Sequence, residues 1–489
     1  MLNYLKEEAN RTFTEYGAST KMTTFSDNLD LFATIGALRH ADNEEIIGRF
    51  QKAFIENPDL AMKNLFFGRD IRGGLGERRT FRVCMKWLAD HHPASVEKNL
   101  EQFGEYGRYD DLLCLMDTPC NESVVRYIGQ CLSDDVTSME SGGPVSLLAK
   151  WLPSVNASNR ETVGTAKKLA KALKMKERDY RKTLCSLRAY IEIIENNLRE
   201  RDYSFDYEKQ PSKALFKYRA AFLRNDEKRY LSYLNGVSRG ERKLNAGTLM
   251  PYDIIRPITE LWGRKPVSEE ERHVMDVTWK AQKDFADDTN ALVVIDGSAS
   301  MYCNRNPQPA AVALSLGVYF AERNKGVFRN HFITFSHNPK LVEVKGRDIV
   351  DKVKYCMGFN EISDTNIQKV FELILQTALK HKVPQEELPK TVYIVTDMEF
   401  NACAKYSGMT NFEYAKQLFS AHGYQLPQIV FWNVDSRNRQ QPVTMNEQGV
   451  ILVSGCSPRI FSMVMDHNYS PYEFMMEVLG SERYAGITA

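Results

Sequence analysis

The sequence lacks the features that mark secreted and membrane-spanning proteins. Nine cysteines, an odd number without any CxxC pair, indicate neither a disulfide framework nor a zinc module. No uninterrupted apolar run approaches the roughly 18 residues that would suggest a membrane span. The start, Met1-Leu-Asn-Tyr-Leu-Lys, lacks the basic-then-apolar order of a signal peptide. We therefore expect a cytoplasmic protein without a membrane partner.

The chain also lacks an excess of charge of either sign. Its formal net charge of +1 suggests no partner. The even balance hides a basic block from Lys150 to Lys243, in which roughly 23 Lys and Arg stand against roughly 12 Asp and Glu. Solvated helix faces would explain such a block. A surface that binds a polyanion is the alternative.

The apolar sequence that is present suffices for more than one folded domain. Of the 489 residues, 43% are hydrophobic and 26% are charged, which is the composition of an ordinary globular protein with two or more domains. We expect residues 1–285 to form a helical-repeat domain. Residues 286–489 are expected to form a doubly wound α/β domain.

Helical periodicity dominates the first of these domains from about residue 43 onward. Asn43-Glu-Glu45 begins a helix, Pro58 opens the next, and a further helix is expected from Glu77. Short helices separated by turns recur up to about residue 285, without an exact sequence repeat. This pattern predicts antiparallel helix pairs stacked side by side, as in an irregular α-solenoid.

Strands and helices alternate after residue 286. Each expected strand is a short apolar run bounded by turn residues. The expected strands are near 291–296, 330–335, 340–344, 391–396, 428–434 and 450–454, and the expected helices are near 309–323, 348–356, 367–382, 411–422, 457–466 and 471–480. This order predicts a doubly wound sheet.

A cluster of oxygen ligands follows the first of these strands. Asp296-Gly-Ser298-Ala-Ser300 comes directly after the apolar run 291–295, so one carboxylate and two hydroxyls lie at a strand's carboxyl end. A hard divalent cation prefers oxygen ligands on a rigid edge, which a buried parallel strand supplies. We therefore predict a site for Mg²⁺, with Mn²⁺ or Ca²⁺ as alternatives.

Two further oxygen groups fall at the ends of elements downstream. Thr365 lies just before the helix expected from residue 367, and Asp397 ends the apolar run 391–396. Each group alone would be explained as a helix cap or an Asx turn. Their order and placement resemble the metal-ion-dependent adhesion site of von Willebrand factor A domains. The metal ligands that this resemblance implies are Asp296, Ser298, Ser300, Thr365 and Asp397.

Catalytic groups are not evident in the sequence around this predicted site. Nothing near Asp296 or Asp397 supplies a general base or a nucleophile pair, and the nine histidines are dispersed without a triad signature. We therefore expect a binding protein and not an enzyme.

The basic block contains the residues that we predict to bind RNA. Its cations are interleaved with Tyr180 and Tyr190, and in such a surface the charges track phosphates while aromatic faces stack on bases. The predicted contacts are Lys167, Lys168, Lys171, Lys174, Arg178, Arg181, Lys182 and Arg188.

Two loops of the helical part combine glycine, arginine and acidic residues. The segment 68–79 places four glycines among four arginines, and the segment 106–111 mixes aromatic rings with opposed charges. Such loops suit the binding of an anion. The structural interpretation, which we prefer, is an ion-pair network that locks two helix turns together. Its members would be Arg69, Arg72, Arg78, Arg79, Asp70, Glu77, Asp110 and Asp111.

Three motifs carry a resemblance to a known family. They are Arg69-Asp-Ile-Arg-Gly-Gly-Leu-Gly-Glu-Arg78, Tyr106-Gly-Arg-Tyr-Asp-Asp-Leu-Leu113 and Lys150-Trp-Leu-Pro153. With the A-type domain that follows, they resemble the TROVE-module proteins typified by the Ro autoantigen, and more closely a related group of plant, bacterial and viral proteins. The resemblance implies a ring or solenoid of HEAT-like repeats closed by the A domain. It also implies RNA ends bound in the hole and small structured RNAs on the basic outer face.

The leading hypothesis from these features is a Ro-like RNA-binding protein. It would form a ribonucleoprotein with non-coding or misfolded RNA, without specificity for DNA, and would carry a divalent-metal site in the A domain. The alternative is a metal-dependent protein-interaction scaffold without RNA, in which a partner's carboxylate completes the coordination of the ion.

Overall fold

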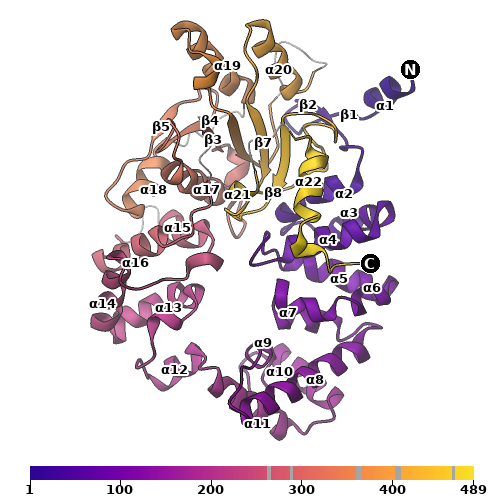
Figure 1. Cartoon of the computed structure of the whole chain (residues 1–489), viewed down its shortest axis with the longest axis vertical. Coiled ribbons are helices and arrows are strands. Elements are labelled where there is room, and N and C mark those ends of the chain that lie inside the picture. Colours follow the sequence, from indigo (N-terminus) through magenta and orange to yellow (C-terminus); the bar gives the residue numbers. More distant parts are fainter. Residues whose placement is uncertain (261–265, 287–289, 360–365, 402–408, 465–468) are drawn as a thin grey trace. The chain divides into compact units, whose positions relative to one another are not determined.

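The structure is a computed structural model that describes residues 1–260, 266–286, 290–359, 366–401, 409–464 and 469–489 (Figure 1). It divides into two compact units. The sheet unit comprises Met1–Asn64 and Pro211–Ala485, and the helical unit comprises Leu65–Gln210 and Gly486–Ala489. No described helix is long and apolar enough to cross a membrane.

A six-stranded sheet forms the centre of the sheet unit. Its strands are β3 (Ala291–Asp296), β4 (His331–Phe335), β5 (Leu341–Glu343), β6 (Thr391–Thr396), β7 (Gln428–Asn433) and β8 (Val450–Ser454). The order is β5-β4-β3-β6-β7-β8, in which β5 is antiparallel to β4 and all other neighbours are parallel. All six expected strands are confirmed within one residue. Five of them are largely buried apolar runs, whereas β5 buries only Val342.

Both faces of this sheet are covered by helices, as the expected doubly wound arrangement requires. On one face, Leu292 and Val294 of β3 pack in a cluster with side chains of α19 (Ile367–His381) and α20 (Asn411–Ala421). On the other, α17 (Pro309–Arg323) approaches so closely that a Cβ at Gly317 would lie 2.1 Å from Ile295 Cδ1. Figure 1 shows α17 and α19 on opposite sides of the sheet.

The remaining helices of the sheet unit come from both ends of the chain. They are α1 (Leu2–Ala9), α2 (Asp27–Phe32), α3 (Asn43–Glu56), α13 (Ser212–Asn225), α14 (Glu227–Ser238), α15 (Pro251–Glu260), α16 (Glu269–Lys280), α18 (Ile349–Met357), α21 (Ile460–Met463) and α22 (Pro471–Leu479). The unit therefore combines segments from both sides of the boundary that we expected after residue 285.

An N-terminal hairpin of β1 (Arg11–Phe13) and β2 (Ser19–Lys21) was not expected from the sequence. Its loop reaches the carboxyl end of β6, where Thr14 Oγ1 donates to the carbonyl of Phe400 at 2.6 Å. Backbone bonds between Lys21 and Gln441, 3.0 and 2.8 Å long, attach β2 to the loop after β7. These contacts place the hairpin beside the edge of the sheet that carries the predicted metal ligands.

The helical unit is built from short helices, in agreement with the periodicity of the sequence. They are α4 (Pro58–Arg69), whose first turns belong to the sheet unit, α5 (Arg79–His91), α6 (Pro93–Glu97), α7 (Phe103–Tyr106), α8 (Asn121–Glu140), α9 (Leu148–Trp151), α10 (Arg160–Ala172), α11 (Glu177–Tyr190) and α12 (Ile194–Glu200). Rings of Phe66, Phe81 and Phe103 form an aromatic core, with centroids 5.3 to 6.2 Å apart in edge-on geometry.

Candidate functional site

Two buried carboxylates meet at the carboxyl edge of the sheet. Asp296 is the last residue of β3, and Asp397 directly follows β6, its parallel neighbour. Both side chains are at most 2% exposed. The chain adds β4 and β5 on one side of β3 and then β6, β7 and β8 on the other. The boundary between β3 and β6 is therefore the topological switch point, which is where open α/β sheets bind ligands.

Asp296 is held by donors from both strands' ends. Its Oδ1 accepts from the backbone N–H of Ser298 at 2.9 Å, and its Oδ2 accepts from Thr396 Oγ1 at 2.6 Å. These bonds fix the carboxylate on the rigid edge of β3, which is the presentation that a hard cation requires.

The two predicted serine ligands lie next to these carboxylates. Ser298 Oγ is 2.9 Å from Ser300 Oγ, and Ser300 lies near enough to Asp397 to lower the pKa of that carboxyl group. The structure therefore brings together four of the five predicted metal ligands. The fifth, Thr365, lies outside the described residues.

The electrostatics of this site favour an added cation. Burial and the neighbouring charge of Asp397 together raise the pKa of Asp296 to about 7. Burial also raises the pKa of Asp397, although hydrogen bonding to Ser300 and the charge of Arg437 act in the opposite direction. Two such carboxylates are costly to ionise without a counter-charge, which a divalent ion would supply.

The donor set suits a hard cation that keeps several waters. Within the described chain, no group of three or more His, Cys, Asp or Glu side chains is arranged to hold a metal, so an ion here would depend on two carboxylates, serine hydroxyls and water. Mg²⁺ commonly binds in this manner. The backbone between Asp397 and Glu399 is also strained, because Met398 adopts a φ of 68°, and such strain clusters at functional sites.

Arg437 is a member of this site that the sequence analysis missed. Its Nη2 lies 3.1 Å from Asp397 Oδ2, and its Nη1 lies 3.1 Å from Glu15 Oε2 in the hairpin loop. A weak signal for Arg437 was present, since it lies in the loop that follows β7. Glu15 gave no such signal, because its segment is remote in sequence.

Glu399 fixes the loop that carries Arg437. Its Oε1 accepts from Asn438 Nδ2 and from Gln440 Nε2, each at 2.8 Å, and its Oε2 accepts from the backbone N–H of Glu15 at 2.9 Å. The side chain is 1% exposed. The loop after β7 and the hairpin are thus tied to the same edge as the candidate metal ligands.

The predicted RNA-binding residues are mostly exposed on α10, α11 and the turn between them. Seven of the eight are exposed, namely Lys167, Lys168, Lys171, Lys174, Arg178, Arg181 and Lys182. Lys167 and Lys168 make ion pairs with Glu177 and Asp117, at 3.4 and 3.3 Å. Exposed pairs of this kind contribute little energy, so these cations are available to an anionic ligand.

Arg188, the eighth predicted residue, is hydrogen-bonded within the protein. It is half-buried and donates to the carbonyls of Ala149 and Leu152, at 2.8 and 2.6 Å, and to Ser154 Oγ at 2.5 Å. These bonds support the turn that contains the Lys150–Pro153 motif.

The proposed stacking role of Tyr180 is wrong. Tyr180 is fully buried, and its hydroxyl donates to the carbonyl of Pro153 at 2.9 Å. It shares the buried face of α11 with Leu184 and Leu187, at the i, i+4 and i+7 positions of a helix. Tyr190 is 40% exposed and remains accessible to a base.

The preferred structural interpretation of the glycine–arginine loops is confirmed in part, because one of the predicted ion pairs is present. Arg69 Nη2 lies 2.7 Å from Asp111 Oδ2, with both side chains at most 2% exposed. Arg82, which we did not predict, bonds to Asp111 Oδ1 at 2.6 Å. Arg108 lies with its guanidinium 4.0 Å from the centre of the Trp151 ring. The three motifs therefore form one connected network within the helical unit.

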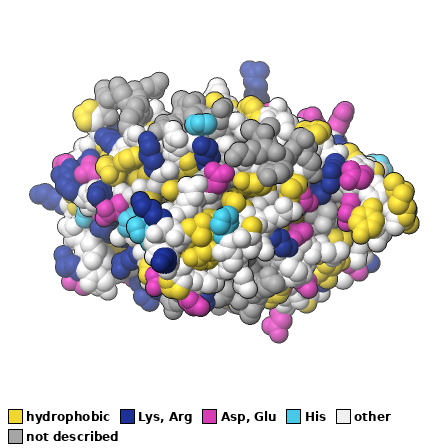
Figure 2. All heavy atoms as spheres, turned by 90° about the horizontal axis from the view of Figure 1, so that it is seen from above, with side chains coloured by type: hydrophobic (Ala, Val, Ile, Leu, Met, Phe, Trp, Pro, Cys, Tyr) yellow, Lys and Arg dark blue, Asp and Glu magenta, His cyan; other side chains and the backbone are white. Residues whose placement is uncertain are grey.

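The face seen in Figure 2 carries Lys, Arg, Asp and Glu side chains interspersed. Among its coloured residues no broad field of one sign stands out. Because a field of one sign is what steers a polyanion to a surface, this face gives no separate support to RNA binding.

Comparisons with known proteins place the chain in a family. The model described as Domain of unknown function (DUF7788) matches residues 290–482. An uncharacterized protein of Acanthamoeba polyphaga mimivirus is 28% identical, over 96% of this chain and 87% of the relative. The crystal structure of the Ro (RSR) protein of Deinococcus radiodurans aligns with 93% of this chain and 100% of its own, at 13% identity and a TM-score of 0.46. The model described as Domain of unknown function (DUF2828) matches residues 14–118 and 119–286, more than half of the chain, so the protein belongs to the DUF2828 family.

Proposed function

We propose that the protein is a non-enzymatic binding protein whose C-terminal domain is of the von Willebrand A type and holds a divalent cation. Asp296, Ser298, Ser300 and Asp397 would bind Mg²⁺, with Mn²⁺ or Ca²⁺ as alternatives, and Thr365 would complete the set. The observation that carries this proposal is the meeting of Asp296 and Asp397 at the ends of adjacent parallel strands.

The chain's own residues prepare the site for a ligand. Thr396 and the Ser298 backbone orient Asp296, while Ser300 links the serine pair to Asp397. A bound divalent ion would neutralise both carboxylates and remain electrophilic, because hydroxyls add no negative charge. The expected ligand is an anionic oxygen, such as the side-chain carboxylate of a protein partner.

Calorimetric titration with Mg²⁺ and Mn²⁺ tests this function. Asp296→Asn and Asp397→Asn should each abolish binding in a protein whose circular dichroism is unchanged. Asp435→Asn is the matched control, since Asp435 is also buried beyond a strand end but is paired with Arg305. Retention of full metal affinity in both site variants would show that the ion binds elsewhere.

A second function, RNA binding, is favoured by the exposed cations of α10 and α11. Charges at this density track a phosphate backbone and make the affinity depend on salt. In this proposal the helical region is a HEAT-like array that carries a non-coding or misfolded RNA in a cytoplasmic ribonucleoprotein, as the sequence resemblance to Ro-like proteins implies. Arg188 would support this surface from within and not contact RNA.

A further inference from the structure

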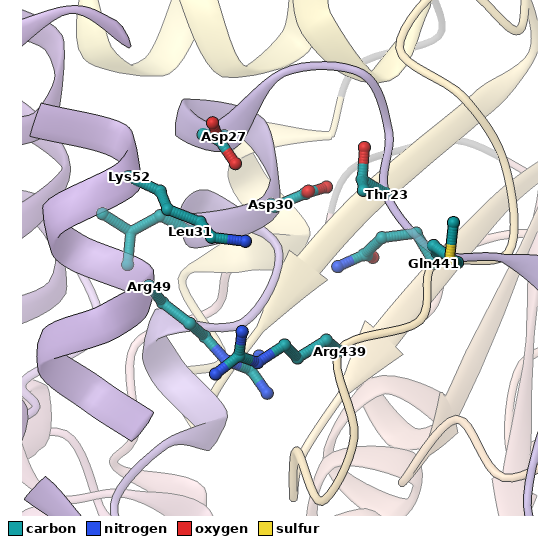
Figure 3. Close-up of a pocket in the computed structure, with 9 residues that line it drawn as sticks. Thr23, Asp27, Asp30, Leu31, Arg49, Lys52, Arg439 and Gln441 are labelled. Atoms are coloured by element: carbon teal, nitrogen blue, oxygen red, sulfur yellow. The ribbon is translucent and has the colours of Figure 1, made fainter. Parts of the chain in front are cut away.

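The sheet unit contains a small pocket that none of the preceding functions uses. It encloses about 50 Å³ between α2, α3 and the loop after β7, and Thr23, Leu31 and Gln441 are among its lining residues (Figure 3). A water molecule needs roughly 10–15 Å³ of such space. The pocket therefore has room for about three to five water-sized atoms.

One buried donor in this pocket lacks an acceptor. The side chain of Gln441 is 3% exposed, and its Nε2 has no hydrogen-bond partner in the described chain. Figure 3 shows the amide nitrogen directed into the pocket. Leaving such a donor unsatisfied costs about 1–3 kcal/mol. A ligand atom that accepts a hydrogen bond from Gln441 Nε2 would remove this cost.

One carboxyl group in the same pocket is not part of an ion pair in the described chain. Asp30 accepts from the backbone N–H of Thr24 at 2.9 Å. Burial raises the pKa of Asp30 to about 7, and the charge of Asp27 acts in the same direction, whereas the hydrogen bonds with Thr24 and the charge of Arg49 only partly oppose this rise. A cationic ligand group next to Asp30 would restore its ionised form.

The charges around the pocket are balanced in number but separated in space. Arg49 and Arg439 share Glu45, with Nε to Oε1 distances of 2.6 and 2.9 Å. In Figure 3 their guanidinium groups lie on one side of the pocket, and Asp27 and Asp30 lie on the other.

Lys52 also lines the pocket. The three cations are thus Arg49, Arg439 and Lys52, and the three carboxylates are Glu45, Asp27 and Asp30. A ligand with a net charge would therefore face repulsion from one side. A neutral ligand with separated charges would not.

We propose that this pocket binds a small zwitterion, of the size of an α-amino acid, through its carboxylate and its ammonium group. The carboxylate accepts from Gln441 Nε2 and lies toward Arg49, Lys52 and Arg439. The ammonium group lies against Asp30 and Asp27. This site shares no residue with the candidate metal ligands.

Glycine, with five heavy atoms, is the probe that tests the site on the full-length protein. Calorimetry should show that glycine binds at least about tenfold tighter than acetate or methylammonium, a difference of about 1.4 kcal/mol. Each of these two ions satisfies only one side of the pocket. This comparison uses the unmodified protein, so it does not depend on the folding of any variant.

Two substitutions test the contacts. Gln441→Met and Asp30→Asn should each weaken glycine binding at least tenfold. Gln51→Met on α3 and Asp59→Asn on α4 are matched controls at exposed positions and should leave the affinity unchanged. The proposal is overturned if glycine does not bind, if acetate binds as tightly as glycine, or if the site variants and the controls behave alike.

Discussion

Arg437 donates to Asp397, with 3.1 Å between Nη2 and Oδ2, at the sheet edge where we propose that a divalent cation binds. The same guanidinium contacts Glu15 of the N-terminal hairpin. Because a guanidinium and a divalent ion would both compensate the charge of Asp397, we expect them to compete for it. The ion pair between Arg437 and Asp397 should therefore lower the affinity of the proposed site for metal.

Replacement of Arg437 should strengthen metal binding. In Arg437→Gln the cation that competes for Asp397 is removed, and charges about 4 Å apart interact by several kcal/mol in a partly buried site. We expect Mg²⁺ affinity to rise at least about tenfold in calorimetric titration. Arg437→Lys, which keeps the charge, should stay near the wild type. Weaker binding in Arg437→Gln would mean that Arg437 supports the metal site.

Mg²⁺ should stabilise the folded protein by mass action. At about 100 times its Kd, a ligand that binds only the native state adds about 2.7 kcal/mol to the free energy of unfolding. Thermal unfolding with Mg²⁺ and with chelator measures this difference. Asp296→Asn should abolish the Mg²⁺-dependent gain, whereas Asp435→Asn should retain it. An equal gain in both variants would place the ion outside the proposed site.

Asp30 should make stability fall with rising pH. Its pKa is about 7 in the folded state, whereas an unfolded Asp titrates near 3.9. Between these values the folded protein holds a proton that the unfolded chain has lost, so the free energy of unfolding decreases as pH rises from about 4 to 7.

Asp30→Asn removes this titration and should stabilise the protein above pH 7, by at most about 4 kcal/mol. Urea unfolding across this pH range measures the effect, with Asp59→Asn as the exposed control. Curves for wild type and Asp30→Asn that run parallel in pH would contradict the assignment.

Charge reversal on α10 and α11 should weaken RNA binding and reduce its salt dependence. The variant combines Lys171→Glu, Arg178→Glu and Lys182→Glu, all at exposed positions. Loss of three phosphate contacts lowers the log–log salt slope by about 2 for single-stranded RNA. The control reverses three exposed lysines of the sheet unit, Lys354, Lys380 and Lys416. An equal salt slope of RNA affinity in both variants would show that the basic block is a solvated surface that does not bind RNA.

Removal of Arg69 should destabilise the protein strongly. Arg69→Met leaves Asp111 fully buried with a lost partner, and breaking a buried pair costs about 3–5 kcal/mol. The exposed Arg79→Met substitution should change the free energy of unfolding by no more than about 0.5 kcal/mol. Urea unfolding compares the two. Similar small effects would show that the network does not support the helical unit.

The strands and the metal ligands were predictable because their signals are local. A buried parallel strand is a short apolar run, and its carboxyl end is the next polar residue, so Asp296 and Asp397 could be placed without a structure. The residues near Tyr180 in the sequence gave a misleading signal, because they include Arg178, Arg181 and Lys182, whereas the helix face that Tyr180 shares is apolar. Side-chain direction on a helix is set by periodicity and not by adjacent residues.

By itself, the sequence determined the six strands, the helices between them, and the carboxylates and hydroxyls that meet at the sheet edge. Only the tertiary structure decided what lies against them. The backbone N–H of Glu15 donates to Glu399, which is 384 positions away in the chain, and Arg439 pairs with Glu45, which is 394 positions away. No local pattern specifies such a pairing, because it arises from packing the N-terminal segment onto the sheet. The hairpin, the Arg437 ion pairs and the zwitterion pocket therefore became visible only in the folded chain.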